Sequence, residues 1–274
     1  MLIETGKIRE YARATAASAP AYFAPDRAPI PPTFLSTVVF WEDLTDVFDL
    51  PAARAAFAGA GIVPDVGRLL SLQQEYEFHG AYPRAGDDLT TTVRFDGSEV
   101  KQGRSGRMLM LRFAVDFARA GALVCTARYT SACLESAAVG PSGDVSRRTP
   151  EPTGERLADR AFGPLTMTDV VRYQGASGDF NPMHHDDDMA RAAGYPAAFS
   201  VGMLGAAQLA TYCVDQFGVE SVRRFRARFT GLVFRGETLV ARGWLTETSA
   251  GRHLQLVLVN DHGRSVVEAD VDLS

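Results

Sequence analysis

A stretch of the chain from residue 192 to residue 214 carries no charged side chain. A membrane-spanning helix needs about 20 consecutive apolar residues, but this stretch includes three glycines, a proline and the polar residues Gln208 and Thr211. A helix that is buried on all sides in a soluble protein has the same composition. We therefore predict a central helix at Gly202–Phe217 that other elements surround, and we expect no membrane segment.

The composition is that of a globular protein and argues against several functional classes. The 274 residues are 46% hydrophobic, and the length suits one large domain or two small ones. A net charge of −5 disfavours nucleic-acid binding, which usually needs a basic face. Cys125, Cys133 and Cys213 form no CxxC pattern, so we expect neither a disulfide framework nor a zinc site. The N-terminus shows no apolar segment behind a basic start, and we expect a cytoplasmic protein.

A linker is expected near the middle of the chain. Residues 139–158 are rich in proline, glycine, serine and charged residues and show no hydrophobic period. This segment separates an N-terminal half, residues 1–138, from a C-terminal half, residues 159–274. Because it divides the chain so evenly, the two halves were compared for an internal repeat.

Two sequence matches indicate that the halves are copies of one unit. Residues 11–20 align without gaps on residues 173–182, with tyrosine, alanine and proline in common and an offset of 162 positions. Residues 78–80 match residues 229–231 in the same way, as Phe-His-Gly on Phe-Thr-Gly, each followed by a second glycine. The matches occur in the same order on either side of the linker, which favours a duplication.

Each half has a similar predicted order of elements. A short amphipathic helix, at Ile8–Thr15 or Met167–Ala176, precedes a polar segment with proline, an apolar stretch and a set of strands. We expect strands near Leu72–Phe78, Leu89–Phe95, Met108–Ala118, Ala122–Ala132, Val222–Phe229, Thr238–Thr246, His253–Val259 and Ser265–Leu273. Residues 119–121 and 261–263 are expected as hairpin turns, and residues 97–106 as a flexible hairpin loop. The pattern predicts an α+β fold in which an antiparallel sheet wraps a buried helix.

Polar and ionisable residues that could take part in catalysis are most concentrated between Ser177 and Asp186. Asp179 and His184 stand on either side of Pro182, which disfavours a continuous helix, so a turn can bring them together. A carboxylate and an imidazole in a partly apolar pocket form a general acid/base pair that contributes about 10²- to 10⁴-fold in rate. The alternative is a structural turn followed by an acidic helix N-terminus.

A metal site and a phosphate-binding site are less favoured interpretations of nearby residues. The adjacent histidines His184 and His185, with the acidic residues that follow, have metal-binding side chains, but successive residues seldom face one ion, so we expect no metal. Arginines near the C-terminal strands can in principle bind the phosphates of a cofactor. A solvated strand face is the favoured interpretation of these arginines, which are Arg223, Arg224, Arg226, Arg228 and Arg235.

Residues 173–204 resemble the signature of the MaoC-like, R-specific enoyl-CoA hydratase family. The shared pattern is an aromatic residue, then Ser-Gly-Asp-x-Asn-Pro-x-His, a short acidic helix and a glycine that opens the central helix. The similarity extends over about residues 165–245, and the N-terminal half resembles the degenerate, FAS1-like dehydratase half of double-hot-dog members. The resemblance implies an α+β double hot-dog fold, in which each antiparallel sheet wraps a central helix.

The resemblance also assigns site residues. It implies that Asp179 and His184 are the catalytic dyad and that Ser177, Asn181 and Gly202 bind the substrate. The N–H of Gly202 at the helix N-terminus is expected to hold the thioester oxygen, because unpaired N–H groups there stabilise developing negative charge. Family members often have histidine before this glycine, whereas this chain has valine.

The N-terminal copy has lost the corresponding groups. At the offset of 162 positions, Ala17 takes the place of Asp179, and Tyr22 takes the place of His184. Ala19 likewise stands where the C-terminal half has asparagine. We therefore expect one active site per chain, with the N-terminal half completing the substrate tunnel.

The activity implied by the resemblance is the reversible hydration of a trans-2-enoyl-CoA to a (3R)-3-hydroxyacyl-CoA in fatty acid metabolism. The substrate is a thioester of coenzyme A or acyl carrier protein, and we expect no separate cofactor, no nucleic acid and no membrane partner. A homodimer or a hetero-oligomer is possible. Two alternatives stay open, namely a hot-dog acyl-CoA thioesterase and a non-catalytic subunit that binds acyl thioesters or a partner.

Overall fold

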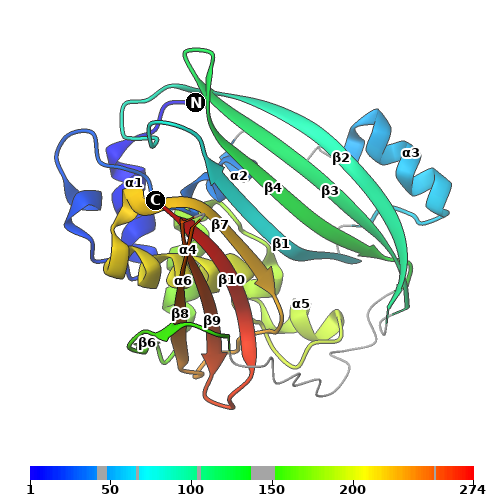
Figure 1. Ribbon diagram of the computed structural model, residues 1–274. Coiled ribbons are helices and arrows are strands. Elements are labelled where there is room, and N and C mark those ends of the chain that lie inside the picture. Colours follow the sequence, from blue (N-terminus) through cyan, green and yellow to red (C-terminus); the bar gives the residue numbers. More distant parts are fainter. Residues whose placement is uncertain (42–47, 66–67, 104–105, 137–151, 250) are drawn as a thin grey trace.

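The computed structural model describes residues 1–41, 48–65, 68–103, 106–136, 152–249 and 251–274 (Figure 1). Its strands form one continuous antiparallel sheet in the order β2-β3-β4-β1-β7-β10-β9-β8-β5, and β6 also pairs with β8. The strands are β1 (Leu69–Phe78), β2 (Leu89–Gly103), β3 (Gly106–Arg119), β4 (Ala122–Leu134), β5 (Glu155–Arg156), β6 (Arg160–Phe162), β7 (Val222–Phe229), β8 (Leu239–Thr248), β9 (Gly251–Asn260) and β10 (Ser265–Leu273). The predicted α+β class is confirmed.

Helix α6 (Gly202–Phe217) has the predicted bounds and lies within the curve of the C-terminal strands (Figure 1). All residues from Met203 to Val214 are buried. A side chain added at Gly205 would place its Cβ only 3.0 Å from Val267 on β10, so glycine allows the helix to approach the sheet closely. Across the described part of the chain, no helix has the length and apolar character that crossing a membrane requires.

The two halves meet at a pair of central strands, where β1 pairs with β7 over residues 73–77 and 224–228. Glu75 is the partner of Arg226, and the two are 151 positions apart, the same separation as Phe78 and Phe229 in the sequence match. Corresponding residues of two copies face one another only near a symmetry axis. The seam between β1 and β7 therefore lies on an approximate two-fold axis that relates the two halves.

A second contact lies on the same axis. Helix α1 (Thr5–Ala14) packs against helix α4 (Met167–Ser177), and the hydroxyl oxygens of Tyr11 and Tyr173 are 3.4 Å apart. These tyrosines are the two that head the sequence match at an offset of 162 positions. The hydroxyl of Tyr11 also donates to Thr33 Oγ1 at 3.0 Å, which anchors this side chain within the N-terminal half. Through α1, the N-terminal half therefore packs against α4.

The N-terminal half lacks a described helix as long as α6. Its counterpart is a 3-10 turn, η2 (Phe34–Thr37), that continues as the single turn α2 (Val38–Trp41). Helix α3 (Pro51–Ala60) then packs on β2 and β3 at the far end of the sheet, where Phe57 and Leu111 belong to a second, smaller hydrophobic core (Figure 1). This helix was not predicted, although Pro51 in its first turn and a left-handed Gly61 after its end are typical boundary residues.

One loop prediction was wrong, and one segment of the expected linker is structured. Residues 97–103 do not form a loop but continue β2, which pairs with β3 as far as Gly103 and Gly106. Their side chains are mostly exposed, so the sequence shows no alternation of hydrophobic and polar residues here. Backbone hydrogen bonds to β3 stabilise this part of the strand. Within the expected linker, Glu155 and Arg156 pair with β8, and residues 139–151 lie outside the described part of the chain.

Glu75 provides a test of the seam. Its side chain is only 9% exposed and accepts hydrogen bonds from Arg128 on β4 at 2.9 Å and from Arg224 on β7 at 2.8 Å. Glu75→Gln leaves two arginines without their shared charge, and we expect the free energy of unfolding to fall by about 1–3 kcal/mol in urea denaturation. The exposed Glu99→Gln on β2 is the control, with an expected change within about 0.5 kcal/mol. Equal effects of the two substitutions would contradict this role of Glu75.

Candidate active site

The candidate site is built on a turn that follows helix α4. Gly178 has a left-handed conformation with φ of 82° and ends the helix, and its N–H donates to the carbonyl of Gln174 at 2.8 Å. A 3-10 turn, η5 (Pro182–His184), comes next, and the Oδ1 atom of Asn181 caps it by accepting from Met183 N–H. The chain thus reverses between Asp179 and His184.

The turn brings the two predicted acid/base groups together. The Nε2 atom of His184 lies 4.0 Å from Oδ2 of Asp179, and the side chains are only 11% and 18% exposed. This distance is too long for a direct hydrogen bond. A single oxygen atom placed beside the pair can still lie within about 2.8 Å of both atoms, so the arrangement suits a shared water molecule.

The backbone fixes the tautomer of His184. Its Nδ1 atom lies 2.9 Å from the carbonyl oxygen of Phe199, and a carbonyl only accepts hydrogen bonds. The hydrogen of the neutral ring is therefore on Nδ1, and Nε2 keeps a free lone pair that faces Asp179. The Phe199 ring packs edge-on against the imidazole, with ring centres 5.2 Å apart, and holds its orientation.

Burial acts on both groups in a way that favours their neutral forms. It raises the pKa of Asp179 and, against the attraction of that carboxylate, lowers the pKa of His184. Both shifts move the single proton of the pair toward Asp179. The pair therefore holds a carboxylic acid and a neutral imidazole more readily than two isolated groups would.

Gly202 stands at the start of α6 and is exposed. No described group accepts a hydrogen bond from its N–H, and the helix dipole adds a partial positive charge there. A Cβ at this position would lie 3.0 Å from the ring of Phe229, so glycine avoids a tight contact there. The geometry suits an oxygen that gains negative charge. The residue before it, Val201, is buried and adds no polar group.

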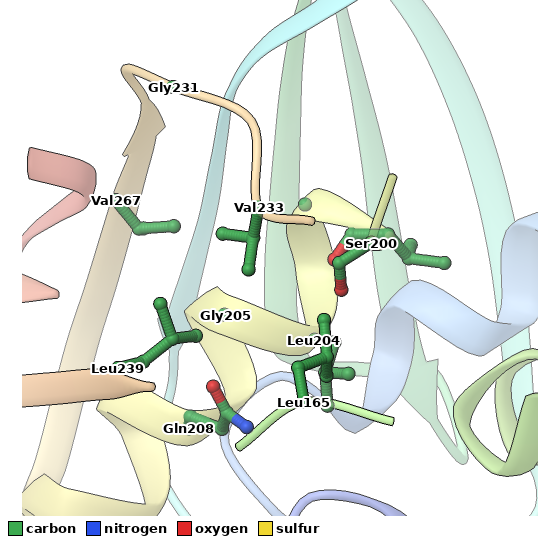
Figure 2. A pocket seen from close by; sticks show the side chains of 11 residues that line it. Leu165, Ser200, Leu204, Gly205, Gln208, Gly231, Val233, Leu239 and Val267 are labelled. Carbon is green, nitrogen blue, oxygen red and sulfur yellow. The ribbon is translucent and has the colours of Figure 1, made fainter. Parts of the chain in front are cut away.

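A small cavity of about 20 Å³ lies beside the first turns of α6 (Figure 2). Ser200, Gly202 and Gln208 line it together with apolar side chains from the surrounding strands and loops. The Oε1 atom of Gln208 is buried and has no hydrogen-bond partner among the described residues. The volume is enough for about one water molecule, which would satisfy this oxygen.

Ser177 and Asn181, the other predicted substrate-binding residues, hold the turn itself. The hydroxyl of Ser177 is buried and accepts from the N–H of Asp179 at 3.2 Å. The N–H of Asn181 donates to Oδ1 of Asp179 at 3.3 Å, and its side chain caps the following 3-10 turn. A direct contact of either side chain with substrate stays a prediction.

Four of the five C-terminal arginines are engaged in ion pairs, as the strand-face interpretation expects. Three of them pair on one face of the sheet and a fourth pairs at helix α5 (Asp187–Ala192), as Arg224 with Asp272, Arg226 with Asp270, Arg228 with Glu268 and Arg235 with Asp187. The paired carboxylates compete with any phosphate for these guanidinium groups.

The adjacent histidines are directed to different partners. Nδ1 of His184 meets the Phe199 carbonyl, whereas Nδ1 of His185 meets Gln174 Oε1 at 3.0 Å. The two rings therefore do not converge on one point. Within the described ranges, one group of three possible metal ligands lies elsewhere, at Glu237, Asp261 and His262 beside the turn between β9 and β10.

The N-terminal half repeats the backbone of the site without its chemistry. Ser200 N–H donates to Val233 O in one half, and Ile30 N–H donates to Pro83 O in the other. The next pair of equivalent bonds joins residues 204 and 201 in one half and residues 34 and 31 in the other. The donor residues are 170 positions apart in both cases.

This offset places Pro32 where the C-terminal half has Gly202. Proline has no N–H, so the N-terminal half lacks the open donor as well as the dyad, whose positions Ala17 and Tyr22 occupy. Comparison of the two halves in sequence did not reveal this loss of the N–H donor at Pro32. Eight additional positions separate the two matched segments, and the described helical turns after Pro32, η2 and α2, are shorter than α6.

Two family models match the chain, and together they cover most of it. Residues 1–127 match the FAS1-like, dehydratase domain region, and residues 148–266 match the MaoC like domain. One relative is the peroxisomal enoyl-CoA hydratase 2 of Arabidopsis thaliana. It is 28% identical over 254 residues, which cover 88% of this chain and 77% of the relative.

Solved structures show the same fold. A MaoC-like dehydratase from Phytophthora capsici has a TM-score of 0.75 at 18% identity and covers 99% of this chain and 93% of its own. A Mycobacterium tuberculosis protein described as a double hotdog fold has a TM-score of 0.59 at 14% identity, with 100% and 92% covered. The chain therefore joins a FAS1-like dehydratase region to a MaoC-like dehydratase domain in one double hot-dog fold.

Proposed function

We propose that the chain catalyses the reversible hydration of a trans-2-enoyl thioester to a (3R)-3-hydroxyacyl thioester with Asp179 and His184 as its acid/base pair. The observation that carries this proposal is the buried carboxyl–imidazole pair, 4.0 Å apart, on a turn that follows α4. The exposed N-terminus of α6 supplies a donor for the thioester oxygen. The name of the Arabidopsis relative supports the same reaction class.

The tautomer of His184 supports an assignment of the two proton transfers. In hydration, the free Nε2 of His184 takes a proton from the shared water as the water oxygen bonds to Cβ. Asp179, as a carboxylic acid, gives its proton to Cα, where the electron pair of the double bond arrives. Both groups act from one side of the substrate, so the addition is syn. The proton on His184 then returns to Asp179, and dehydration follows the same steps in reverse.

Negative charge builds on the thioester oxygen when water attacks Cβ. We propose that the N–H of Gly202 donates to that oxygen, because preorganised donors at a helix N-terminus stabilise such a transition state strongly. The thioester carbonyl itself acidifies Cα, and no atom changes its oxidation state through an external acceptor. We therefore expect the reaction to need neither a metal nor a redox cofactor.

The identity of the acyl carrier and the setting of the enzyme are part of the proposal. The relative's name favours coenzyme A over acyl carrier protein as the carrier. The role in fatty acid metabolism and the assembly as a homodimer or hetero-oligomer stay predictions. The cytoplasmic location also stays a prediction, and the relative differs from it in being a peroxisomal protein. We further propose that residues 1–138 are a non-catalytic half, that residues 139–158 link the halves, and that residues 159–274 hold the site.

Substitution of either dyad residue tests the proposed reaction. With crotonyl-CoA and a longer trans-2-enoyl-CoA, Asp179→Asn and His184→Ala are each expected to lower kcat by at least about 10²-fold, because each removes one proton transfer. Loss of the absorbance of the conjugated thioester reports hydration, and chiral analysis identifies the product. The exposed His262→Gln, at a turn between strands, is the control and should match the unsubstituted protein.

The assay also separates the alternatives. Release of free thiol without loss of the double bond would indicate a thioesterase. Tight binding of the enoyl-CoA without turnover would indicate a binding subunit. Hydration that persists in both dyad variants would contradict the proposed roles of Asp179 and His184.

The titration of His184 tests the electrostatic account. Burial lowers the pKa of His184 below its usual value of 6.5, while the Asp179 carboxylate opposes this shift. The ionised form of Asp179 favours the imidazolium, and Asp179→Asn removes that form, so we expect the imidazole to titrate at a still lower pH in this variant. NMR of the ring protons, with His184→Ala used to assign the signal, measures both midpoints. A higher midpoint in Asp179→Asn would contradict the account.

A further inference from the structure

The buried carboxamide of Gln174 lies in the last turn of α4, beneath the turn that carries the dyad. Its Nε2 donates to the carbonyl oxygens of Asp179 at 2.8 Å and of Asn181 at 3.1 Å. Its Oε1 lies 3.0 Å from Nδ1 of His185. We propose that Gln174 is a positioning residue that sets the spacing of the dyad, and that His185 locks the orientation of its amide. This inference rests on the proposed hydration.

The donor and acceptor pattern permits one arrangement of this amide. Both carbonyl oxygens only accept hydrogen bonds, so the –NH₂ group of Gln174 must face them. Its oxygen then faces His185, whose Nδ1 must carry the hydrogen. A flipped amide would place its oxygen against two carbonyl oxygens and its –NH₂ against an N–H donor. His185 therefore selects the orientation in which both carbonyl bonds form.

Gln174 provides a side-chain connection between the turn and α4 that is additional to the one from Ser177 at the helix end. The other bonds of the turn are local and use backbone N–H groups, such as Asp179 N–H to Ser177 Oγ and Asn181 N–H to Asp179 Oδ1. Among the described residues, the carbonyl of Asp179 has Gln174 as its one hydrogen-bond donor. Without this bond, the backbone of Asp179 keeps only its local bond to Ser177 and can shift relative to His184, which the Phe199 carbonyl holds in place.

A small shift of this kind has a large kinetic effect. A displacement of about 1 Å between reacting groups can lower the rate by about 10²-fold even when the substrate still binds. The residues responsible need not touch the substrate. Gln174 is only 1% exposed, whereas His185 is exposed and reaches the amide with one ring nitrogen. We therefore expect a large effect on kcat for Gln174 and a smaller one for His185.

Matched substitutions separate positioning from simple structural support. Gln174→Met keeps the length of the side chain and removes every hydrogen bond, and we expect kcat to fall about 10- to 100-fold while KM changes less than about threefold. At the neighbouring site, asparagine can place its amide N–H where histidine has Nδ1–H. We expect His185→Leu to lose several-fold in kcat and His185→Asn to recover most of that loss. Val171→Ala, at an exposed site on the same helix, is the control for the helix.

The pH profile supplies a readout that mere destabilisation does not change. A changed spacing alters the mutual influence of Asp179 and His184, so both limbs of the kcat/KM profile should move in Gln174→Met. A smaller fraction of folded protein lowers the amplitude and leaves the limbs in place. Lower amplitude with unmoved limbs would overturn the proposal, as would equal activity of His185→Leu and His185→Asn.

The failure of this inference differs from failure of the proposed function. If Asp179→Asn abolishes hydration while Gln174→Met keeps the kcat and pH profile of the unsubstituted protein, only the role of Gln174 is overturned. If the unsubstituted protein does not hydrate enoyl-CoA, the NMR titration of His184 in Gln174→Met still tests the spacing. A shifted midpoint supports the positioning role, and an unchanged midpoint overturns it.

Discussion

Burial of α6 is the constraint on which the rest of the structure depends. A helix whose residues from Met203 to Val214 are all buried cannot lie on a surface, so the C-terminal strands must curve around it. Each large apolar side chain that this removes from water contributes about 1.5–3 kcal/mol. Both ends of the helix are exposed, and at the N-terminal end the N–H of Gly202 has no acceptor among the described residues. The same burial that holds the fold together therefore places an unpaired N–H donor on the surface of the site.

The approximate two-fold axis explains how a half without the acid/base groups supports the candidate site in the other half. Equivalent residues meet across it, as Glu75 with Arg226 in the sheet and Tyr11 with Tyr173 between helices. Because α1 packs on α4, the N-terminal half holds the helix from which the catalytic turn begins. Pro32, which stands in place of the glycine donor, leaves this support intact. One chain thus keeps two copies of a frame and a single dyad.

The parts of the fold that sequence reasoning predicted are those with a strong hydrophobic signal. The absence of charge defined the bounds of α6, and alternation defined those of β10. The outer ends of β2 and β3 were missed because their side chains are exposed and their stability comes from backbone pairing. In the site, Pro182 predicted the turn that brings the dyad together. Two contacts orient the dyad, one from Gln174 to the carbonyl oxygen of Asp179 and one from His184 to the carbonyl oxygen of Phe199. Every residue has a backbone carbonyl, so the sequence cannot indicate which of them will accept these hydrogen bonds.

The central claim is that one carboxyl group and one imidazole act from the same side of the double bond. Hydration in D₂O, followed by NMR of the 3-hydroxyacyl product, tests it most directly. The account predicts a single diastereomer with deuterium at Cα on the same face as the hydroxyl added at Cβ. Addition on opposite faces, or a mixture of the two diastereomers at early times, would contradict a mechanism that runs through Asp179 and His184 as a pair.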